Sequence, residues 1–236
     1  MFFIEVHSYS EMASFRVPET HTLQQTLPLP PKTALIGLVG AAVGLSFQEA
    51  MNFCCRDHQI HFGVIGTHRG KVGDLWKYRK IKSGETITAV LIREYLIDFE
   101  MRLYVGCNDN SLMNKIRGCF LDPHYVLTAG NSDLLLKLKS ISPVFAAEII
   151  PVSDFEYTMI PGNHSGNYDS NIDLRTIPLM RDIYAPQVQL LPVEFDFWGN
   201  ERRVKSRQPF TFIDTPVRFK AAVDGFQVGE RVVALI

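Results

Sequence analysis

Polar and apolar residues alternate over residues 3–9, which predicts a first strand that ends near residues 8–9. The proline-rich stretch 27–31 then leads into an apolar run from Ala34 to Phe47. Prolines suit the residues just before a helix and its first turn, and Thr33 is a residue type that caps helices, so this run predicts a first helix.

The next alternating positions, from Ile60 to Val64, predict a second strand. A polar and basic segment follows from Thr67 to Thr88, and apolar residues return over 89–105 with a break near Asp98. This order indicates a hairpin inserted between two strands.

Asn108 or Asp109 is placed to cap a second helix, whose face includes Leu112 and Ile116 and which must stop by Pro123. Residues 125–128 begin another extended segment. The order of elements is the βαββαβ pattern of a ferredoxin-like or RRM-type α+β domain. We therefore expect a ferredoxin-like domain over residues 1–142, with the inserted hairpin at about 67–95, and a β-rich C-terminal subdomain over 143–236.

The composition is that of an ordinary globular protein, with 46% hydrophobic and 21% charged residues among 236. The N-terminal residues lack the pattern of a secretory signal, and the run 34–47 is shorter than the roughly 20 residues that span a bilayer. We expect a cytoplasmic protein with no membrane contact.

No motif for a metal, a cofactor or a catalytic nucleophile is present. The four cysteines form no C-x-x-C pair, the seven histidines are scattered, and neither G-x-G-x-x-G nor G-x-S-x-G occurs. We therefore expect no metal, no cofactor and no catalytic residue.

The net charge of −1 gives no global attraction to nucleic acid, so any RNA binding must come from a local concentration of charge. The segment Arg69–Lys82 of the inserted hairpin carries such a concentration, with only Asp74 opposing its basic residues. Trp76 and Tyr78 lie among these cations, and stacking on an aromatic ring contributes roughly 1–3 kcal/mol per unpaired base. A solvated hairpin with its aromatics turned to the core is the alternative. The basic residues are Arg69, Lys71, Lys77, Arg79, Lys80 and Lys82.

Two further sites are weaker candidates. Lys32 and Thr33 lie at the start of the predicted helix, where free N–H groups and the helix dipole favour a phosphate. A second basic run at residues 202–207 has no clear aromatic interleaving, so a solvated face is the favoured interpretation and an RNA or protein contact is the alternative.

Several segments, in this order along the chain, resemble the Cas-five family of CRISPR-associated proteins, the RAMP-superfamily subunit of type I Cascade complexes. The segments are Ser14–Arg16, Thr26–Ala34, the glycine-rich stretch Gly37–Gly44, Trp76–Lys80, Arg93–Leu96 and Tyr125–Ser132. Together they cover about the first 140 residues, and the style of the match is closest to the type I-B members.

The resemblance implies a crRNA-binding subunit that caps the 5′ handle of the guide RNA, and not an enzyme. Its inserted hairpin would be the family's thumb. Its partners would be the crRNA, the Cas-seven backbone, the large subunit of Cas-eight type and, indirectly, target DNA, in support of antiviral DNA interference. The RNA-binding residues would be Ser14, Phe15, Arg16, Lys32, Thr33, Arg69, Lys71, Trp76, Lys77, Tyr78, Arg79, Lys80, Lys82, Arg93, Tyr95, Asn131 and Ser132.

Two other functions stay open. The first is a metal-independent ribonuclease that processes precursor crRNA. The sequence lacks the Lys-His pair of such relatives, but His68 or His124 would supply the base if the fold brought them together. The second is a ferredoxin-like scaffold that binds no RNA, which near-neutral charge favours. The sequence does not decide between a defence role and a transposon-associated one.

Overall fold

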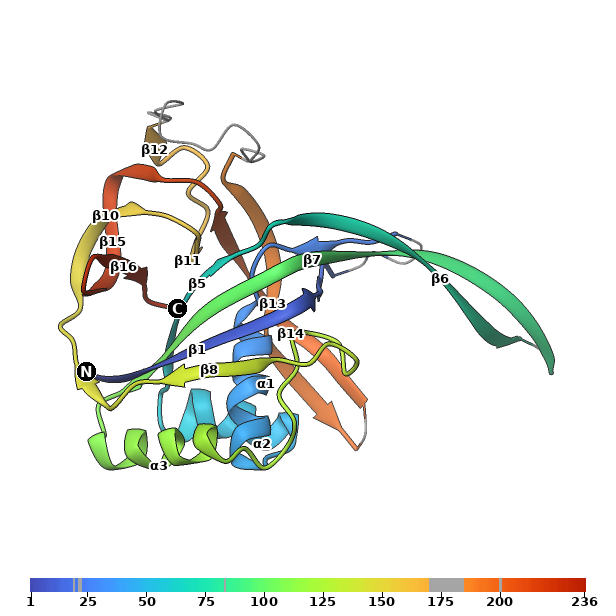
Figure 1. Ribbon diagram of the computed structural model, residues 1–236, viewed down its shortest axis with the longest axis horizontal. Helices are drawn as coiled ribbons and strands as arrows, with labels where there is room; N and C mark the ends of the chain where they lie inside the picture. The colour runs from blue at the N-terminus through green and yellow to red at the C-terminus, as the bar shows by residue number, and fades with distance from the viewer. Residues whose placement is uncertain (19, 21–22, 83, 170–184, 200) are drawn as a thin grey trace.

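The computed structural model describes residues 1–236 except 19, 21–22, 83, 170–184 and 200. The fold is mixed α/β and rich in strands, as the sequence predicts (Figure 1). Its helical elements are α1 (Lys32–Val43), α2 (Phe47–Asn52), the π-helical turn η1 (Phe53–Asp57) and α3 (Asn110–Leu121). Its strands are β1 (Phe2–Ala13), β2 (Phe15–Arg16), β3 (Leu23–Gln24), β4 (Thr26–Leu27), β5 (His61–Thr67), β6 (Gly70–Lys82), β7 (Glu85–Cys107), β8 (Lys137–Ile141), β9 (Phe145–Ala146), β10 (Ile150–Phe155), β11 (Thr158–Pro161), β12 (Tyr168–Asp169), β13 (Gln187–Trp198), β14 (Glu201–Ile213), β15 (Val217–Val228) and β16 (Arg231–Ala234).

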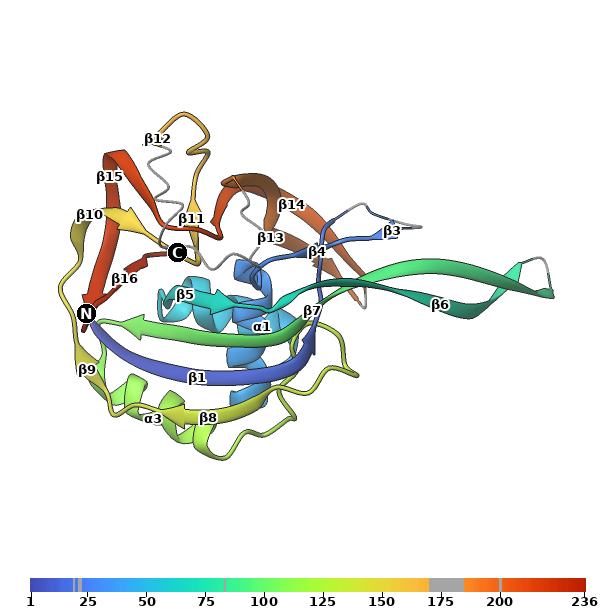
Figure 2. The same cartoon turned by 45° about the horizontal axis from the view of Figure 1, so that its top comes forward.

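Four strands from the first 141 residues lie side by side in the order β5-β7-β1-β8, and every neighbouring pair is antiparallel (Figure 2). The longest pairing joins β1 to β7, from Phe2 opposite Cys107 to Ala13 opposite Leu96. Alternate side chains of a strand point to opposite faces. Ile4 and Val6 therefore enter the main core with the helices, which lie on one side of the sheet in Figure 1.

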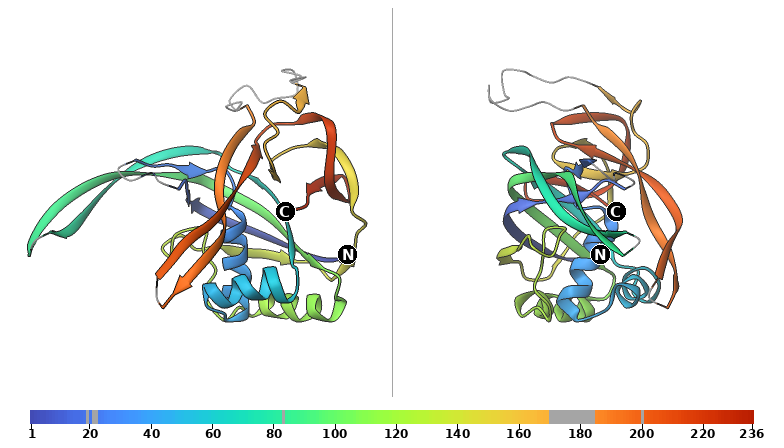
Figure 3. Two further views of the ribbon diagram at one scale, coloured as in Figure 1. Left: turned by 180° about the vertical axis from the view of Figure 1, so that it is seen from behind. Right: turned by 90° about the vertical axis from the view of Figure 1, so that its right-hand side faces the viewer.

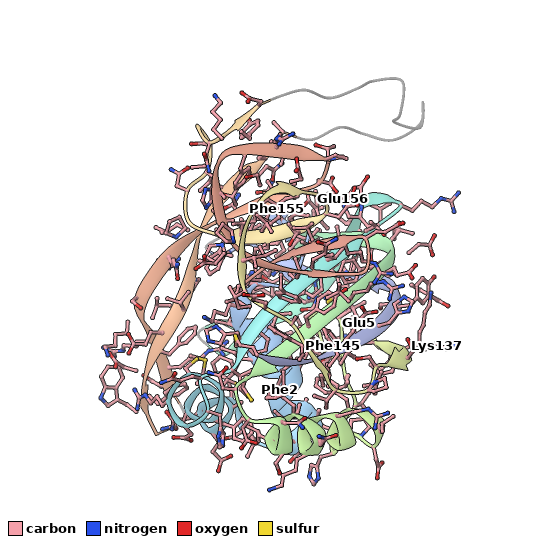
Figure 4. All side chains as sticks on the ribbon, turned by 90° about the vertical axis from the view of Figure 1, so that its left-hand side faces the viewer. Phe2, Glu5, Lys137, Phe145, Phe155 and Glu156 are labelled. Atoms are coloured by element: carbon pink, nitrogen blue, oxygen red, sulfur yellow. The ribbon has the colours of Figure 1, made fainter. Side chains whose placement is uncertain are left out.

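The other face of this sheet is covered in part by a second, four-stranded sheet of β10, β12, β15 and β16. Phe3 stacks on Phe226 with ring centroids 4.3 Å apart, and Tyr104 meets Phe226 edge to face. Glu5 binds the two parts together, because its carboxylate accepts a hydrogen bond from the Tyr104 hydroxyl at 2.9 Å and lies 3.3 Å from the Arg231 guanidinium. Figure 4 shows Glu5 below Phe155, the last residue of β10, and below Glu156, which follows it.

Strands of the C-terminal half also extend the first sheet. The domain boundary predicted at residue 142 falls between β8 and β9. Beyond it, β11 pairs with β5 and with β14, and β14 pairs with β13. The β13–β14 hairpin passes beside the helical layer (Figure 3).

Several element boundaries differ from the sequence predictions. β1 continues to Ala13, past the end predicted near residues 8–9. The N-cap of α1 is Pro31 and not Thr33, and the helix ends before Phe47 because Gly44 adopts the left-handed conformation at φ 92°. β7 runs unbroken through Asp98, which is accommodated at φ 51°.

Two predictions about the second helical unit have different outcomes. The Asp109 cap is confirmed, since its side chain accepts hydrogen bonds from the backbone of the first turn of α3. The prediction that residues 125–128 begin the next strand of the sheet is wrong. These residues form a loop, with a single bridge from Thr128 to Leu135, and the next sheet strand starts at Lys137.

Within the described part of the chain, no single helix is long and apolar enough to cross a membrane. The pair formed by α1 and Phe47–Asp57 passes that test only together, and the two segments meet at a 112° bend. The same residues contain no group of three or more His, Cys, Asp or Glu side chains placed to hold a metal ion.

Candidate nucleic-acid interface

The inserted hairpin is formed by β6 and the first half of β7, and we call it the thumb hairpin (70–97). It projects far from the rest of the molecule (Figure 1). Its two strands are in register from Gly70 opposite Ile97 to Lys82 opposite Glu85. Residues directly opposite each other in such a ladder share one face of the hairpin.

Trp76 and Tyr78 lie on one face, which we call the ring face, together with their cross-strand partners Leu91 and Ala89. Tyr78 is 42% exposed. The Trp76 ring is different, because it packs partly against the main core and the Arg93 guanidinium lies over it, 4.2 Å from the ring centroid. The indole N–H is buried and has no hydrogen-bond partner in the part of the chain that the structure describes. Tyr78 is therefore the open aromatic of this face.

Lys77 and Arg79 point to the opposite face, opposite Val90 and Thr88. That face also carries apolar side chains, with Leu75 68% and Ile81 77% exposed. We call it the apolar-basic face. The sequence suggested one surface of interleaved rings and cations, but strand alternation separates Trp76 and Tyr78 from Lys77 and Arg79.

The remaining thumb cations have different surroundings. Arg69 is strongly exposed and its guanidinium lies 3.7 Å from the Asp98 carboxylate. Lys71 lines a small depression with Pro28 and Gln187. The side chains of Lys80 and Lys82 lie outside the described part of the structure.

Arg93 connects the root of the thumb to two other segments. Its Nε donates to Gln24 Oε1 at 3.2 Å, and its Nη1 donates to the Tyr95 hydroxyl at 3.4 Å and lies 3.9 Å from the Asp133 carboxylate. Together with the contact to Trp76, these interactions hold the Arg93 side chain against the protein, and only 18% of it is exposed. Tyr95 itself is buried.

Ser14 and Phe15 are also turned inward. The Ser14 hydroxyl donates to the Glu94 carbonyl at 2.9 Å, and the Phe15 ring packs edge to face on Phe99. Arg16 follows on the other side of the strand and is exposed, with Nη2 donating to the Thr20 carbonyl at 2.6 Å. Of the three residues that the resemblance assigns to the RNA handle, Arg16 is the one whose side chain is on the surface.

The late glycine loop packs directly on this segment. The Ser14 N–H donates to the Ala129 carbonyl at 3.0 Å, and Gly130 has φ 103°. A Cβ on Gly130 would lie 1.9 Å from the Ser14 carbonyl oxygen, so only glycine allows this approach. Asn131 and Ser132 follow in the turn, half-buried and exposed respectively.

Hydrogen bonds thus bring together four segments that are far apart in the sequence. Besides the Ser14 contacts, the Thr26 N–H donates to the Glu94 carboxylate at 3.1 Å and the Phe15 N–H donates to the Thr26 hydroxyl at 2.9 Å. The segments of the resemblance at residues 14–16, 26–34, 93–96 and 125–132 therefore converge at the root of the thumb.

Lys32 and Thr33 are the first two residues of α1. Among the described residues, no side chain caps this helix end, and no acidic residue lies in its first turn. The N–H groups of Ala34 and Leu35 donate to the Pro31 carbonyl, which leaves those of Lys32 and Thr33 for an anion.

The second basic run does have aromatic partners, which sequence reasoning missed. The Arg202 guanidinium lies over Phe47 and Phe195, and that of Arg203 lies 5.3 Å from the centre of the Trp198 ring. These rings come from α2 and from β13. The contacts could have been predicted only if the pairing of β13 with β14 were known.

His68 and His124, the histidines considered for RNA cleavage, lie on separate segments of the fold. The His124 ring packs on Tyr125 and beside Gly44, at the end of α1. His68 instead follows the end of β5.

The fold is that of CRISPR proteins of known structure. A chain of a CRISPR RNA-guided surveillance complex matches with a TM-score of 0.56 and 15% identity, over 92% of this chain and 91% of that one. The crystal structure of a CRISPR protein from Archaeoglobus fulgidus matches with a TM-score of 0.54 and 10% identity, over 99% of this chain and 98% of that one.

A family model described as CRISPR-associated protein (Cas_Cas5) matches residues 3–207. The chain therefore belongs to the Cas-five family of CRISPR-associated proteins, and the resemblance drawn from its segments is confirmed. No curated protein matches the sequence at a significant level.

Proposed function

We propose that this chain is the subunit of a type I CRISPR effector complex that holds the 5′ handle of the guide RNA. The thumb hairpin would contact the neighbouring Cas-seven backbone subunit, and the body would contact the large subunit of Cas-eight type. In this role the protein turns over no substrate. It would work in the cytoplasm as part of a complex that recognises target DNA.

The observation that carries the proposal is the thumb hairpin and its exposed side chains. A two-stranded hairpin is marginally stable alone, and exposed apolar patches mark interaction sites. Leu75, Ile81 and Val90 are all more than half exposed. A partner that covers this face would account for their position on a projecting hairpin.

The two faces of the thumb suit two kinds of contact. Tyr78 on the ring face offers an open aromatic surface for an unpaired base. The apolar-basic face offers a hydrophobic surface for a protein, and Lys77 and Arg79 add charge for nearby phosphates. The contacts that join the Arg16 segment, the Gly130 loop and the thumb root support the proposal, because the resemblance assigns these segments to RNA binding.

We also propose that the first half of the chain is a ferredoxin-like domain and that the protein is a type I-B member. The strand order β5-β7-β1-β8 with helices between β1 and β5 and between β7 and β8 supports a ferredoxin-like domain of RAMP type. The style of the sequence match supports a type I-B member.

The central experiment measures binding of a labelled repeat-derived RNA to the purified full-length chain. Replacing Tyr78 by Ala removes the open ring and should weaken binding by about 1–3 kcal/mol, the range measured for stacking on one base. Leu121→Ala is the control, because Leu121 is 58% exposed at the end of α3, outside the thumb and outside the segments of the resemblance. Equal binding by both variants and the unchanged protein would contradict the assignment of the ring face to RNA.

The same RNA, incubated without metal, tests the non-catalytic part of the proposal. We expect the RNA to remain intact. Site-specific cleavage that persists in the presence of a chelator would instead identify the chain as a processing ribonuclease.

A further inference from the structure

A cavity of about 530 Å³ lies between the start of α1, the α2–η1 segment and the β13–β14 hairpin. Figure 3 shows the hairpin running beside these helices in both views. Pockets for small ligands and cofactors have volumes of about 300–1,000 Å³, so this space suits a group of the size of one nucleotide. None of the residues discussed for the thumb lines it.

Two cations line the cavity. Lys32 and Arg56 make no ion pair among the described residues. The carboxylate of Glu194 is nearby, but it is already 2.6 Å from Lys205 Nζ and accepts from the Ser206 hydroxyl. Lys205, which does not line the cavity, thus offsets much of the charge of Glu194, on which Arg56 also acts.

The thiol of Cys55, another lining residue, indicates where this charge acts. Partial desolvation raises the pKa of Cys55, Lys32 and then Arg56 oppose that rise, and the smallest cause, Glu194, adds to it. Both cations therefore favour negative charge at the same position. The uncapped N-terminus of α1, where Lys32 is the first residue, adds the positive end of a helix dipole.

The remaining carboxylate in the lining is Asp196. It lies directly opposite Arg203 in the β13–β14 ladder, and opposite charges at such positions offset each other. Asp196 also acts on Lys205, so two cations outside the cavity lining share its charge with Lys32 and Arg56.

Three side-chain amides complete the polar lining: Gln48, Asn52 and Gln208. Among the described residues, none of these amides has a hydrogen-bond partner within the protein. An amide offers both donors and an acceptor, the groups that pair with the edge of a nucleobase. Phe195 and Phe197 form an apolar wall, held from behind by Phe47 with ring centroids 5.6 Å and 6.2 Å away.

We propose that this cavity binds one nucleotide, with its phosphate between Lys32 and Arg56 and its base along the Phe195–Phe197 wall, facing the amides. If the proposed function holds, this nucleotide belongs to the guide RNA. A free nucleotide has the same chemistry. The site extends the candidate phosphate contact at Lys32 to residues of α2, η1 and β14 that the sequence did not indicate.

The test uses the full-length chain and two readouts. Repeat-derived RNA carrying 4-thiouridine at single positions is crosslinked by light and the modified peptides are identified. Affinity for the same RNA is measured for Arg56→Ala and for Gln48→Ala/Asn52→Ala. Lys115→Ala, an exposed cation of α3, is the control. Calorimetry with AMP, GMP, CMP and UMP tests the free nucleotides.

We expect one RNA position to crosslink within residues 47–57 or 187–213. Arg56→Ala should weaken RNA binding roughly tenfold, the effect of losing one hydrogen bond to a charged group. The control should bind as the unchanged protein does. A different result would overturn the cavity site and leave the proposed function intact. In that result, RNA binding depends on Tyr78, no RNA position crosslinks to these segments, and Arg56→Ala binds RNA as the unchanged protein does.

If the chain binds no RNA, the proposed function fails and the nucleotides decide the site. Saturable binding of a mononucleotide that is lost in Arg56→Ala would support the cavity as a free-nucleotide site. No binding of any of the four would overturn it.

Discussion

The guanidinium carbon of Arg93 lies 4.2 Å from the centre of the Trp76 ring, so a cation already occupies the indole face at the root of the thumb. The same guanidinium contacts Gln24 and lies near Asp133, on two segments of the body. Cation–π contacts contribute about 0.5–2 kcal/mol, and the planar guanidinium of Arg allows stacking and hydrogen bonding at once. Arg93 therefore acts as a positioning residue that fixes the thumb to the body.

Substitution of Arg93 should loosen Trp76 in proportion to what the replacement keeps. Arg93→Ala should expose Trp76 to the quencher acrylamide more than Arg93→Lys does, because Lys keeps the charge but loses the planar stack. The chain has two tryptophans, so a Trp198→Phe background makes Trp76 the one fluorescent indole. Identical quenching in all three proteins would show that Arg93 does not hold the ring.

Trp76 and Tyr78 should respond differently to RNA. Because Arg93 and the core cover the Trp76 ring, we expect little change in Trp76 quenching when repeat-derived RNA binds in the Trp198→Phe background. Trp76→Ala should lower the free energy of unfolding, and Tyr78→Ala should leave it nearly unchanged. Strong protection of Trp76 by RNA would mean that Arg93 leaves the ring on binding.

The two cations of the apolar-basic face should set part of the salt dependence of RNA binding. For single strands, log affinity falls with log salt with a slope of about −0.7 per phosphate contacted, so Lys77→Ala/Arg79→Ala should make the slope less steep by about 1.4. Lys115→Ala/Arg218→Ala removes two exposed charges outside the thumb and is the matched control. An equal loss of slope in both variants would assign the effect to overall charge and not to the thumb.

The order of elements and the position of the thumb could be predicted from sequence because both depend on local patterns. Alternation located β5, the Asp109 cap located α3, and the polar segment after β5 located the hairpin. The candidate site was harder to predict from the sequence. Phe15 gave no local sign that it packs inside on Phe99, and the separation of Tyr78 from Arg79 depends on strand direction at each residue.

Long-range contacts explain the other omissions. The aromatic partners of Arg202 lie on β13 and α2. Arg56 lines the same cavity as Lys32 only because η1 folds back beside the start of α1. No spacing in the sequence encodes these approaches. Gly130 is an intermediate case, because the glycine loop was recognised by resemblance while its contact with Ser14 appeared only in the structure.

That contact makes Gly130 a sensitive position. Gly130→Ala would force a Cβ against the Ser14 carbonyl at φ 103°, and we expect a loss of about 1–3 kcal/mol in the free energy of unfolding, the usual cost of such strain. Gly118→Ala is the matched control, since Gly118 lies within α3 with nothing within 4 Å of the added Cβ, and it should stabilise by roughly 0.5–1 kcal/mol. Urea unfolding measures both. A neutral Gly130→Ala would show that the loop moves away from Ser14 at little cost.

The pair of His7 and Glu100 predicts how stability changes in acid. A hydrogen bond from the His7 ring lowers the pKa of Glu100 below its ordinary value of 4.5, with Lys139 as a further cause. Because the folded-state pKa is depressed, the ionised carboxylate stabilises the fold above pH 4.5, and this contribution is lost as the pH falls through the lower, folded-state pKa. Glu100→Gln should therefore be less stable than the unchanged protein at pH 7, and the difference should shrink as the pH is lowered below 4.5. Urea unfolding of both proteins across this range measures it, with Glu11→Gln on β1, the strand of His7, as the control. A difference between Glu100→Gln and the unchanged protein that stays constant from pH 7 into acid would show that ionisation of Glu100 does not contribute to the stability of the sheet.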